Sequence, residues 1–539
     1  MKRSLRVILI LALILVFALS TGYAAKNQLV YGMLGDNETL NPILSENFNE
    51  TEIITCIFSR LLRMNDKLQM EPELLAKMPT VSKDNLTYTF QLRKGVKFHD
   101  GVELTSADVK FLYDMKMAPG NAVPSREMWE KIKEFKIIDK YNFQITLKKT
   151  DAPWLENWCY TDCVIPPKHI LEKEFKEGNN SLTKGGAFSR NPIGSGPYRF
   201  VEWKTDQYVM LKKNPNYFIK GQPKIDTIVF KVVPDTNGLL AQFKNGEIDV
   251  YRGAQSNQYR ELIDMKNKGA KIEVFKYPTF TYMHADFNLN HPALKEKVVR
   301  QALCYAFPKQ KFIETVLDGI GTPADSNIVP MSWAYTKNVR KYEYDPEKAK
   351  KMLDEAGWKP GEGGVREKNG VKLAFTMSTN SGNKTREKFE EIAKQEWEAI
   401  GAKVTIQNYE AATLFGDILE NFKFDIIIFA WISAADPDCF TLWHSTQIPT
   451  EANGKQGQNY VSYINPRIDT LVEQGQVELN QAKRAKIYQE VQQILAEEVP
   501  YMFVYYYNEV TAINASLKNF KPNATQASCL WNVWEWELK

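Results

Sequence analysis

Histidine and cysteine are scarce in this sequence, and their spacing excludes the common protein metal sites. The 539 residues include five histidines, and no two of them stand in the H-E-x-x-H arrangement of zinc hydrolases. Cys159 and Cys163 are four residues apart, but no second such pair completes a tetrahedral zinc site. We therefore expect neither a metal nor a cofactor. The six cysteines are expected to be buried thiols or to form one or two disulfides, whose pairing the sequence does not determine.

A large excess of one charge is also missing. Sixty-nine Lys and Arg residues stand against 65 Asp and Glu residues, so the formal net charge is +4. Lys2, Arg3 and Arg6 lie in a segment that we expect to be removed, which leaves 66 basic residues against 65 acidic ones. No basic field remains to attract a nucleic acid or a membrane surface, so we expect no nucleic-acid partner.

The short motifs of the common enzyme classes are absent as well. The sequence contains no nucleophile elbow, no P-loop and no dinucleotide fingerprint. The glycine-rich residues 194–196 are followed by Pro197 and a strand pattern, not by the helix that would present amides to a phosphate. Carboxylates are numerous enough for a glycosidase pair, but nothing distinguishes one pair from the others. We predict that the protein is not an enzyme, with a secreted hydrolase as the alternative from a different class.

Only one apolar run is long. Residues 7–19 are unbroken apolar residues that follow three basic ones, and they are fewer than the ~20 residues of a spanning helix. We expect residues 1–25 to be a signal peptide cleaved after Ala24 or Ala25, with an uncleaved membrane anchor as the alternative. The first cysteine after this run is Cys56, so we expect no lipoprotein attachment and a periplasmic or otherwise extracytoplasmic protein.

Residues 84–114 carry the clearest local pattern in the chain. Tyr88, Phe90 and Leu92 alternate with polar residues, which is typical of a half-buried strand. Turn residues bracket a second short strand, expected at residues 96–98. Thr105 and Asp108 have capping-box spacing, so a helix is expected to follow.

The same stretch resembles a known family. The string TYTFQLRKGVKFHDGVELTSADVKF is similar to the signature of the family 5 bacterial extracellular solute-binding proteins, which are the peptide- and oligopeptide-binding receptors of ABC importers. Further segments resemble the family along the mature chain: NPIGSGPYRF at 191–200, LLAQFKNGEIDVY at 239–251, YMHADFN at 282–288, the helix at 294–307 and the capped helix that begins at Asp345. Pro308 departs from the family, which usually has aspartate there.

The resemblance implies an α/β protein with the two-lobed type II periplasmic-binding-protein fold, three domains and a hinged ligand cleft. At 539 residues the chain is long enough for two or three domains. The expected division is 26–55, 186–278 and 501–539 for domain I, 56–185 for an inserted domain II and 279–500 for domain III. The implied function is capture of an oligopeptide and delivery to the permease subunits of an ABC transporter, by a monomer.

The resemblance also implies which residues bind the ligand. In the peptide receptors, the segment that begins at the position of Trp431 lies in the cleft, and the residues after the first strand run beside the ligand. The residues carried over to this chain are Trp431, Ser433, Asp436, Asp438, Trp443, His444, Glu46, Asn47, Phe48, Tyr282 and Asn288.

One position departs from this pattern. The family's peptide binders place an aspartate three residues after the tryptophan, where it pairs with the ligand's α-ammonium group, and Ala434 stands there in this chain. Either Asp436 takes that role, or no ammonium is bound and Asp436 and Asp438 only cap a turn. The missing aspartate and the tryptophans leave an oligosaccharide as an alternative ligand, and a nickel complex as the least favoured one.

Overall fold

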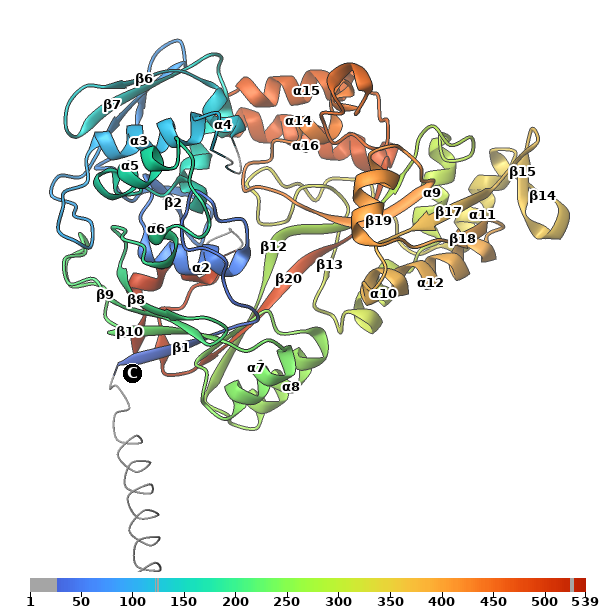
Figure 1. Cartoon of the computed structure of the whole chain (residues 1–539). Helices are drawn as coiled ribbons and strands as arrows, with labels where there is room; N and C mark the ends of the chain where they lie inside the picture. The colour runs from blue at the N-terminus through green and yellow to red at the C-terminus, as the bar shows by residue number, and fades with distance from the viewer. Residues whose placement is uncertain (1–26, 122, 124–125, 524–527) are drawn as a thin grey trace, which may run out of the picture.

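The computed structural model describes residues 27–121, 123, 126–523 and 528–539, so the predicted signal peptide lies outside the described residues. The described residues form a mixed α/β structure, as predicted. Two long neighbouring strands, β12 (Ile272–Phe287) and β20 (Tyr501–Asn514), join two parts of the molecule (Figure 1). The second part consists of the described residues between these two strands, and the first part consists of the described residues outside them. Within the described part of the chain, no helix is both long and apolar enough to cross a membrane.

One large sheet runs through both parts. Its eleven strands include β12 and β20 at the centre, which pair antiparallel with a register shift between Pro278 and Tyr282. On one side of this pair lie β11 (Val250–Arg252), β1 (Gln28–Met33), β10 (Thr227–Val232), β9 (Tyr208–Lys213) and β8 (Tyr198–Lys204). On the other side lie β19 (Ile426–Ile432), β17 (Ala374–Ser378) and β18 (Lys403–Ile406), and β13 (Thr322–Pro323) pairs with β20.

A small four-stranded sheet contains the signature stretch. Its order is β4 (Thr80–Val81), β5 (Thr87–Gln91), β7 (Asn142–Leu147) and β6 (Ile132–Ile137). Tyr88 and Phe90 of β5 are buried, as their alternation predicted. The capping box of Thr105 and Asp108 starts α3 (Ser106–Met117), also as predicted. The strand expected at residues 96–98 is wrong: the close turns on both sides leave room only for a single bridge between Lys97 and Glu103.

The segment after β7 forms 3₁₀ helices rather than an α-helix. The composition of residues 152–163 favours an α-helix, but they form two tight 3₁₀ helices, η1 (Ala152–Cys159) and η2 (Thr161–Cys163). Trp154 and Trp158 of η1 are fully buried, and their rings lie 6.4 and 6.1 Å from the ring of Phe90. Packing of these large side chains on the small sheet therefore outweighs the local helix preference.

The predicted helices of the second part are present with shifted ends. α9 (Lys297–Tyr305) is shorter than the predicted 294–307. α11 (Pro346–Glu355) has Asp345 as its N-cap and Pro346 at its first position, and Gly357 follows with φ +89°, as the sequence indicated. β19 covers Ile426–Ile432, two residues later than the apolar-rich run at residues 424–430, whose pattern is typical of a buried strand.

The remaining α-helices cover the sheets and the connections. They are α2 (Phe48–Ile57), α4 (Glu127–Glu130), α5 (Lys168–Glu177), α6 (Ala187–Arg190), α7 (Thr236–Lys244), α8 (Ser256–Asn267), α10 (Lys309–Val316), α12 (Lys384–Ala399), α13 (Ala411–Thr413), α14 (Phe440–Trp443), α15 (Pro466–Val477) and α16 (Gln481–Glu498). Short strands outside the two sheets are β2 (Leu62–Met64), β3 (Met70–Pro72), β14 (Lys359–Pro360), β15 (Arg366–Lys368), β16 (Val371–Lys372), β21 (Leu517–Lys518) and β22 (Glu537–Leu538).

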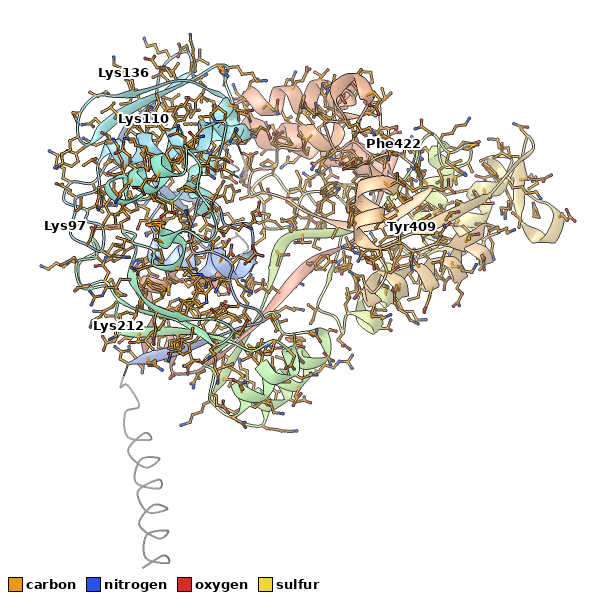
Figure 2. All side chains as sticks on the ribbon, in the orientation of Figure 1. Lys97, Lys110, Lys136, Lys212, Tyr409 and Phe422 are labelled. Carbon is orange, nitrogen blue, oxygen red and sulfur yellow. The ribbon has the colours of Figure 1, made fainter. Side chains whose placement is uncertain are left out.

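Lysine side chains mark the outer surface of the first part. Lys97, Lys136 and Lys212 are exposed at the outer edge of the first part, as Figure 2 shows. Five cysteines, Cys56, Cys159, Cys163, Cys304 and Cys439, are buried thiols, which is the first of the two predicted states. Cys529 is also buried, with its sulfur 3.5 Å from the hydroxyl of Tyr31. The small sheet falls wholly within residues 56–185, but the division into three domains stays a prediction.

Candidate ligand pocket

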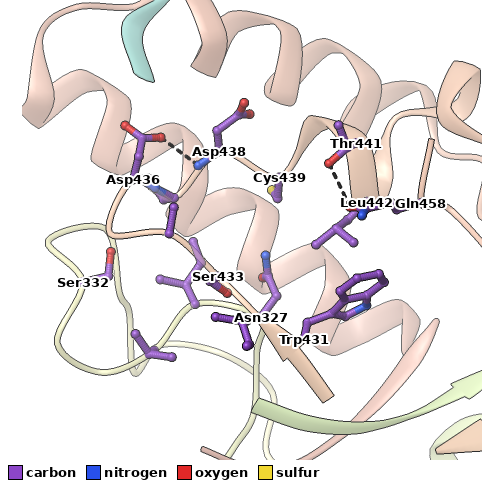
Figure 3. Close-up of a pocket in the computed structure, with 15 residues that line it drawn as sticks. Asn327, Ser332, Trp431, Ser433, Asp436, Asp438, Cys439, Thr441, Leu442 and Gln458 are labelled. Atoms are coloured by element: carbon purple, nitrogen blue, oxygen red, sulfur yellow. Dashed lines mark hydrogen bonds between the residues drawn. The ribbon is translucent and has the colours of Figure 1, made fainter. Parts of the chain in front are cut away.

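A pocket of about 190 Å³ lies where β19 ends, beside the region where the two parts of the molecule meet. Residues within 327–332, about 100 positions earlier in the chain, line it together with residues within 431–442 and Gln458 (Figure 3). β19 is parallel to β17, and β17 is parallel to β18, so the pocket lies at the carboxyl end of a parallel strand. Ligands of open α/β sheets bind in this position, because the connections diverge there and leave a crevice.

Trp431 forms one wall of the pocket. Its ring is half-buried and lies 5.1 Å from the ring of Phe429 at a steep angle, and nearly parallel to the ring of Tyr460 at 6.5 Å. The imidazole of His284 is also nearly parallel to the indole, at 6.3 Å. These contacts hold the indole in one orientation. The next residue, Ile432, is 75% exposed beside the pocket, so an apolar surface is open to a ligand.

Asp436 and Asp438 lie at the opposite end of the pocket. The two oxygens of the Asp436 carboxylate accept hydrogen bonds from the guanidinium of Arg484 on α16, one of them at 2.7 Å. Asp438 accepts from the hydroxyl of Tyr488 at 3.3 Å, and burial, followed by the charge of Asp436, raises the pKa of the Asp438 carboxyl. Asp436 therefore already has a cationic partner within the protein, and it has little capacity left for a ligand ammonium group.

The other polar groups of the pocket carry no charge. They are the side chains of Asn327, Ser332, Ser433, Thr441 and Gln458. Asn327 is 4% exposed, and its carbonyl oxygen has no hydrogen-bond partner among the described residues. Such groups bind amides and hydroxyls by hydrogen bonding, while Trp431 and Ile432 offer apolar contact. This combination is typical of a binding site that recognises uncharged parts of a ligand.

Glu156 and Tyr160, in the part of the molecule that contains the small sheet, contact the loop at residues 433–439 that lines the pocket (the pocket loop). Glu156 of η1 accepts a hydrogen bond at 2.8 Å from the backbone N–H of Asp436. The hydroxyl of Tyr160 donates to the same carboxyl oxygen at 2.6 Å and accepts from the backbone N–H of Ala435 at 3.4 Å. Burial and the nearby charge of Asp436 raise the pKa of Glu156 to about 8.

The structure brings together four of the predicted site residues: Trp431, Ser433, Asp436 and Asp438 line the pocket. They belong to one continuous segment, and their contact with a ligand stays a prediction. The lining residues at 327–332, Gln458 and the partner residue Arg484 were not predicted. The sequence signal for them is weak, because residues 327–332 lie in a loop without periodicity and Arg484 is one of many charged residues on a long helix.

Four other predicted residues lie behind the pocket rather than on its surface. Trp443 and Tyr282 are fully buried, and Trp443 packs 4.4 Å from the ring of Tyr501. His444 is 6% exposed and bonds to Thr446 at 2.8 Å, and Asn288 donates to the backbone carbonyl of Phe424 at 2.7 Å. Because these side chains are buried in the protein interior, they expose almost no surface to a ligand.

The three predicted residues near the first strand are not part of the pocket lining. Asn47 is the N-cap of α2 and accepts from the N–H of Glu50 at 3.1 Å. Glu46 is exposed and pairs with Lys184 at 3.2 Å. Phe48 is 46% exposed, and its ring covers the guanidinium of Arg252 at 4.1 Å. Contact of these residues with a ligand stays a prediction.

The chemistry available in this pocket is binding. In the described residues, no three His, Cys, Asp or Glu side chains are grouped closely enough to hold a metal ion.

Comparison with known proteins places the chain among the solute-binding proteins. The family model described as "Bacterial extracellular solute-binding proteins, family 5 Middle" matches residues 69–450. The oligopeptide-binding protein AppA of Bacillus subtilis is 33% identical over 518 residues, which cover 95% of this chain and 91% of AppA. The dipeptide-binding protein of Escherichia coli is 27% identical, and the match covers 91% of this chain and 91% of that protein.

Solved structures give the same result. The structure of AppA from Bacillus subtilis in complex with a nonapeptide is 32% identical, with a TM-score of 0.72, and the match covers 95% of this chain and 99% of AppA. NikZ from Campylobacter jejuni in complex with Ni(L-His) is 29% identical with a TM-score of 0.74, over 95% and 99% of the chains. The structures therefore share the overall fold over almost their whole length.

Proposed function

Because this chain belongs to the family 5 bacterial extracellular solute-binding proteins, we propose that it captures oligopeptides outside the cytoplasm and delivers them to the permease subunits of an ABC importer. Family 5 proteins are binding receptors, so this protein binds its substrate and does not convert it. The observation that carries the proposal is the match over 95% of the chain to a receptor with a bound nonapeptide.

The pocket supports a peptide ligand. Hydrogen-bonding side chains without charge suit the amide groups of a peptide backbone, and the wall of Trp431 and Ile432 suits an apolar side chain. A volume of about 190 Å³ is enough for one amino-acid side chain but not for a long peptide, so the remaining residues of the ligand would lie along the cleft outside it. The charge pair of Asp436 and Arg484 is internal to the protein and leaves the pocket nearly neutral.

The finer details are part of the same proposal. We infer a periplasmic protein with a cleaved signal peptide, no lipid anchor and a monomeric state. A complex of nickel with an amino acid is the second candidate, because NikZ has a similar structure and binds Ni(L-His). The pocket offers no histidine for such a metal, which favours the peptide.

Mass spectrometry of the small molecules released by denaturing the purified mature protein tests the proposal. A series of short peptide masses would support the peptide receptor. Hexose-spaced masses would overturn it in favour of an oligosaccharide receptor, and nickel in stoichiometric amount would overturn it in favour of the metal complex. If the protein is purified empty, a calorimetric titration with a mixed tripeptide-to-nonapeptide library decides, and absence of binding would overturn the proposal.

A further inference from the structure

A direct contact joins the small-sheet part to the pocket loop. Glu156 lies on η1, whose tryptophans pack on the small sheet, and Asp436 follows β19 of the large sheet. The two residues are 280 positions apart, and their contact is one hydrogen bond from the Asp436 backbone N–H to the Glu156 carboxyl at 2.8 Å. Tyr160 adds a second link, through its hydroxyl, to the N–H of Ala435. These bonds cross from one part of the molecule to the other, directly beside the pocket.

We propose that Glu156 is a proton-dependent latch that holds the cleft closed over the pocket. This inference rests on the proposed function, because a latch matters only in a receptor whose two parts separate to release a ligand. When the parts separate, the Glu156 carboxyl enters water. When they close, it is buried beside the Asp436 residue, and protonation of Glu156 removes the repulsion between the two carboxyl groups.

The surroundings of Glu156 favour its neutral form. Its own segment supplies the Cys159 thiol and the Tyr160 hydroxyl. The hydrogen bonds that the carboxyl accepts, from the Tyr160 hydroxyl at 2.6 Å and the Asp436 N–H at 2.8 Å, favour the charged form, but burial and the charge of Asp436 outweigh them. The pocket loop supplies Asp436 and, further away, Asp438. The nearby cations among the described residues are engaged elsewhere: Arg484 binds both oxygens of Asp436, and Arg60 binds Glu73 and the backbone carbonyl of Cys159. Burial is the largest cause of the raised pKa of Glu156, and the charge of Asp436 is the second.

Other charged groups on the elements packed against η1 have partners elsewhere. They are Arg63 of β2, bonded to Glu71; Arg467, Asp469 and Glu473 of α15, bonded to Glu490, Ser445 and His444; and Asp162 of η2, close to Lys116. None of these contacts places a second cation on Glu156. The carboxyl therefore depends on a proton, not on a salt bridge, for its neutrality.

The direction of the effect follows from linkage. An open-state carboxyl in water titrates near 4.5, and the closed-state pKa is about 8. Between these two values, closing takes up a proton, so closure becomes less favourable as the pH rises. Above the closed-state pKa both states are ionised and closure is weakest.

Small-angle X-ray scattering of the full mature protein at pH 6 and pH 9 tests the latch without any ligand. We expect a larger radius of gyration at pH 9, with an unchanged circular dichroism spectrum. Glu156→Gln keeps an oxygen that accepts from the Asp436 N–H but cannot ionise, so this variant should stay compact at both values. Tyr160→Phe removes the second link and should have a larger radius of gyration than the natural protein at pH 6.

Glu390→Gln is the matched control. Burial also raises the pKa of Glu390, to about 7, but this residue lies on α12 and bonds to Asn408 within the same part of the molecule. The control should expand with pH as the natural protein does. A natural protein with the same radius at both pH values, or a Glu156→Gln variant that still expands, would overturn the latch. Either result leaves the peptide proposal intact, because that proposal is decided by the bound ligand.

Discussion

Both oxygens of the Asp436 carboxylate accept hydrogen bonds from the guanidinium of Arg484, which is 48 positions away in the sequence. Both side chains are buried and almost out of contact with water. Because of this pair, Asp436 has little capacity left to bind a ligand's ammonium group. In the peptide receptors that the sequence resembles, an aspartate of this segment pairs with the ligand's α-ammonium group. Here Ala434 stands at that position, and the acidic residue two places later is neutralised from within the protein.

We expect the receptor to bind peptides with free and with acetylated N-termini equally well. Asp436 has no free oxygen for an ammonium group, so acetylation removes no buried ion pair. The dissociation constants should agree within about twofold, whereas loss of a bound charge pair worth 1.4 kcal/mol would change them about tenfold. Titration calorimetry with matched peptides measures this, and a strong preference for the free amine would return the anchoring role to Asp436.

Breaking the pair should destabilise the protein. Arg484→Gln leaves the buried Asp436 carboxylate without its cation, and the expected loss in the free energy of unfolding is about 3–5 kcal/mol. The double variant Asp436→Asn with Arg484→Gln removes both charges and should recover part of that loss. Urea denaturation of the two variants and of Asp436→Asn completes the cycle. Additive losses would mean that the two charges do not interact.

Trp431→Ala should weaken peptide binding by about 2 kcal/mol, the usual size for loss of a large aromatic contact residue. The ring is half-buried and forms one wall of the pocket. Trp203→Ala serves as the control, since Trp203 lies on β8, is also half-buried and is bonded to Asp36 away from the pocket. Equal affinity in the natural protein and in Trp431→Ala would remove the indole from the binding surface.

Loss of the capping box should cost stability without affecting binding. Thr105 accepts from the N–H of Ala107 at the start of α3, and Thr105→Ala should lower the free energy of unfolding by about 1 kcal/mol. Thr405→Ala, on the exposed side of β18, is a threonine control that should change stability little. A Thr105→Ala variant as stable as the natural protein would show that backbone and packing alone hold this helix start.

Acid should weaken the contact between the signature stretch and residues 194–196. His99 accepts from the N–H of Gly194 at 3.2 Å, and burial lowers its pKa from 6.5 to about 4. The unfolded chain binds this proton first, so the stability that the neutral His99 contributes is complete above pH 6.5 and is lost as the pH falls towards 4. Denaturation midpoints of the natural protein and of His99→Gln between pH 4 and pH 7 measure the effect. Parallel pH profiles for the two proteins would contradict it.

Local features were predictable because they depend on residues close together in the chain. The alternation in β5, the capping box of α3 and the proline start of α11 each involve residues no more than a few positions apart. The exceptions are equally informative. Residues 96–98 and 152–163 have the local pattern of a strand and a helix, but close turns and the packing of Trp154 and Trp158 decide their structure.

The sequence by itself determined the family, the mixed α/β class and the position of the segment 431–438 that lines the pocket. Each of these depends on motifs or patterns within continuous stretches of the chain. Only the tertiary structure decided which of the predicted side chains line the pocket and which are buried behind it. Trp443 and Tyr282 belong to the core, and Arg484 and Glu156 reach the pocket loop from 48 and 280 positions away from Asp436. Charge pairing and burial depend on which residues the fold brings together. Residues this far apart in the sequence produce no local sequence pattern that could predict their contact.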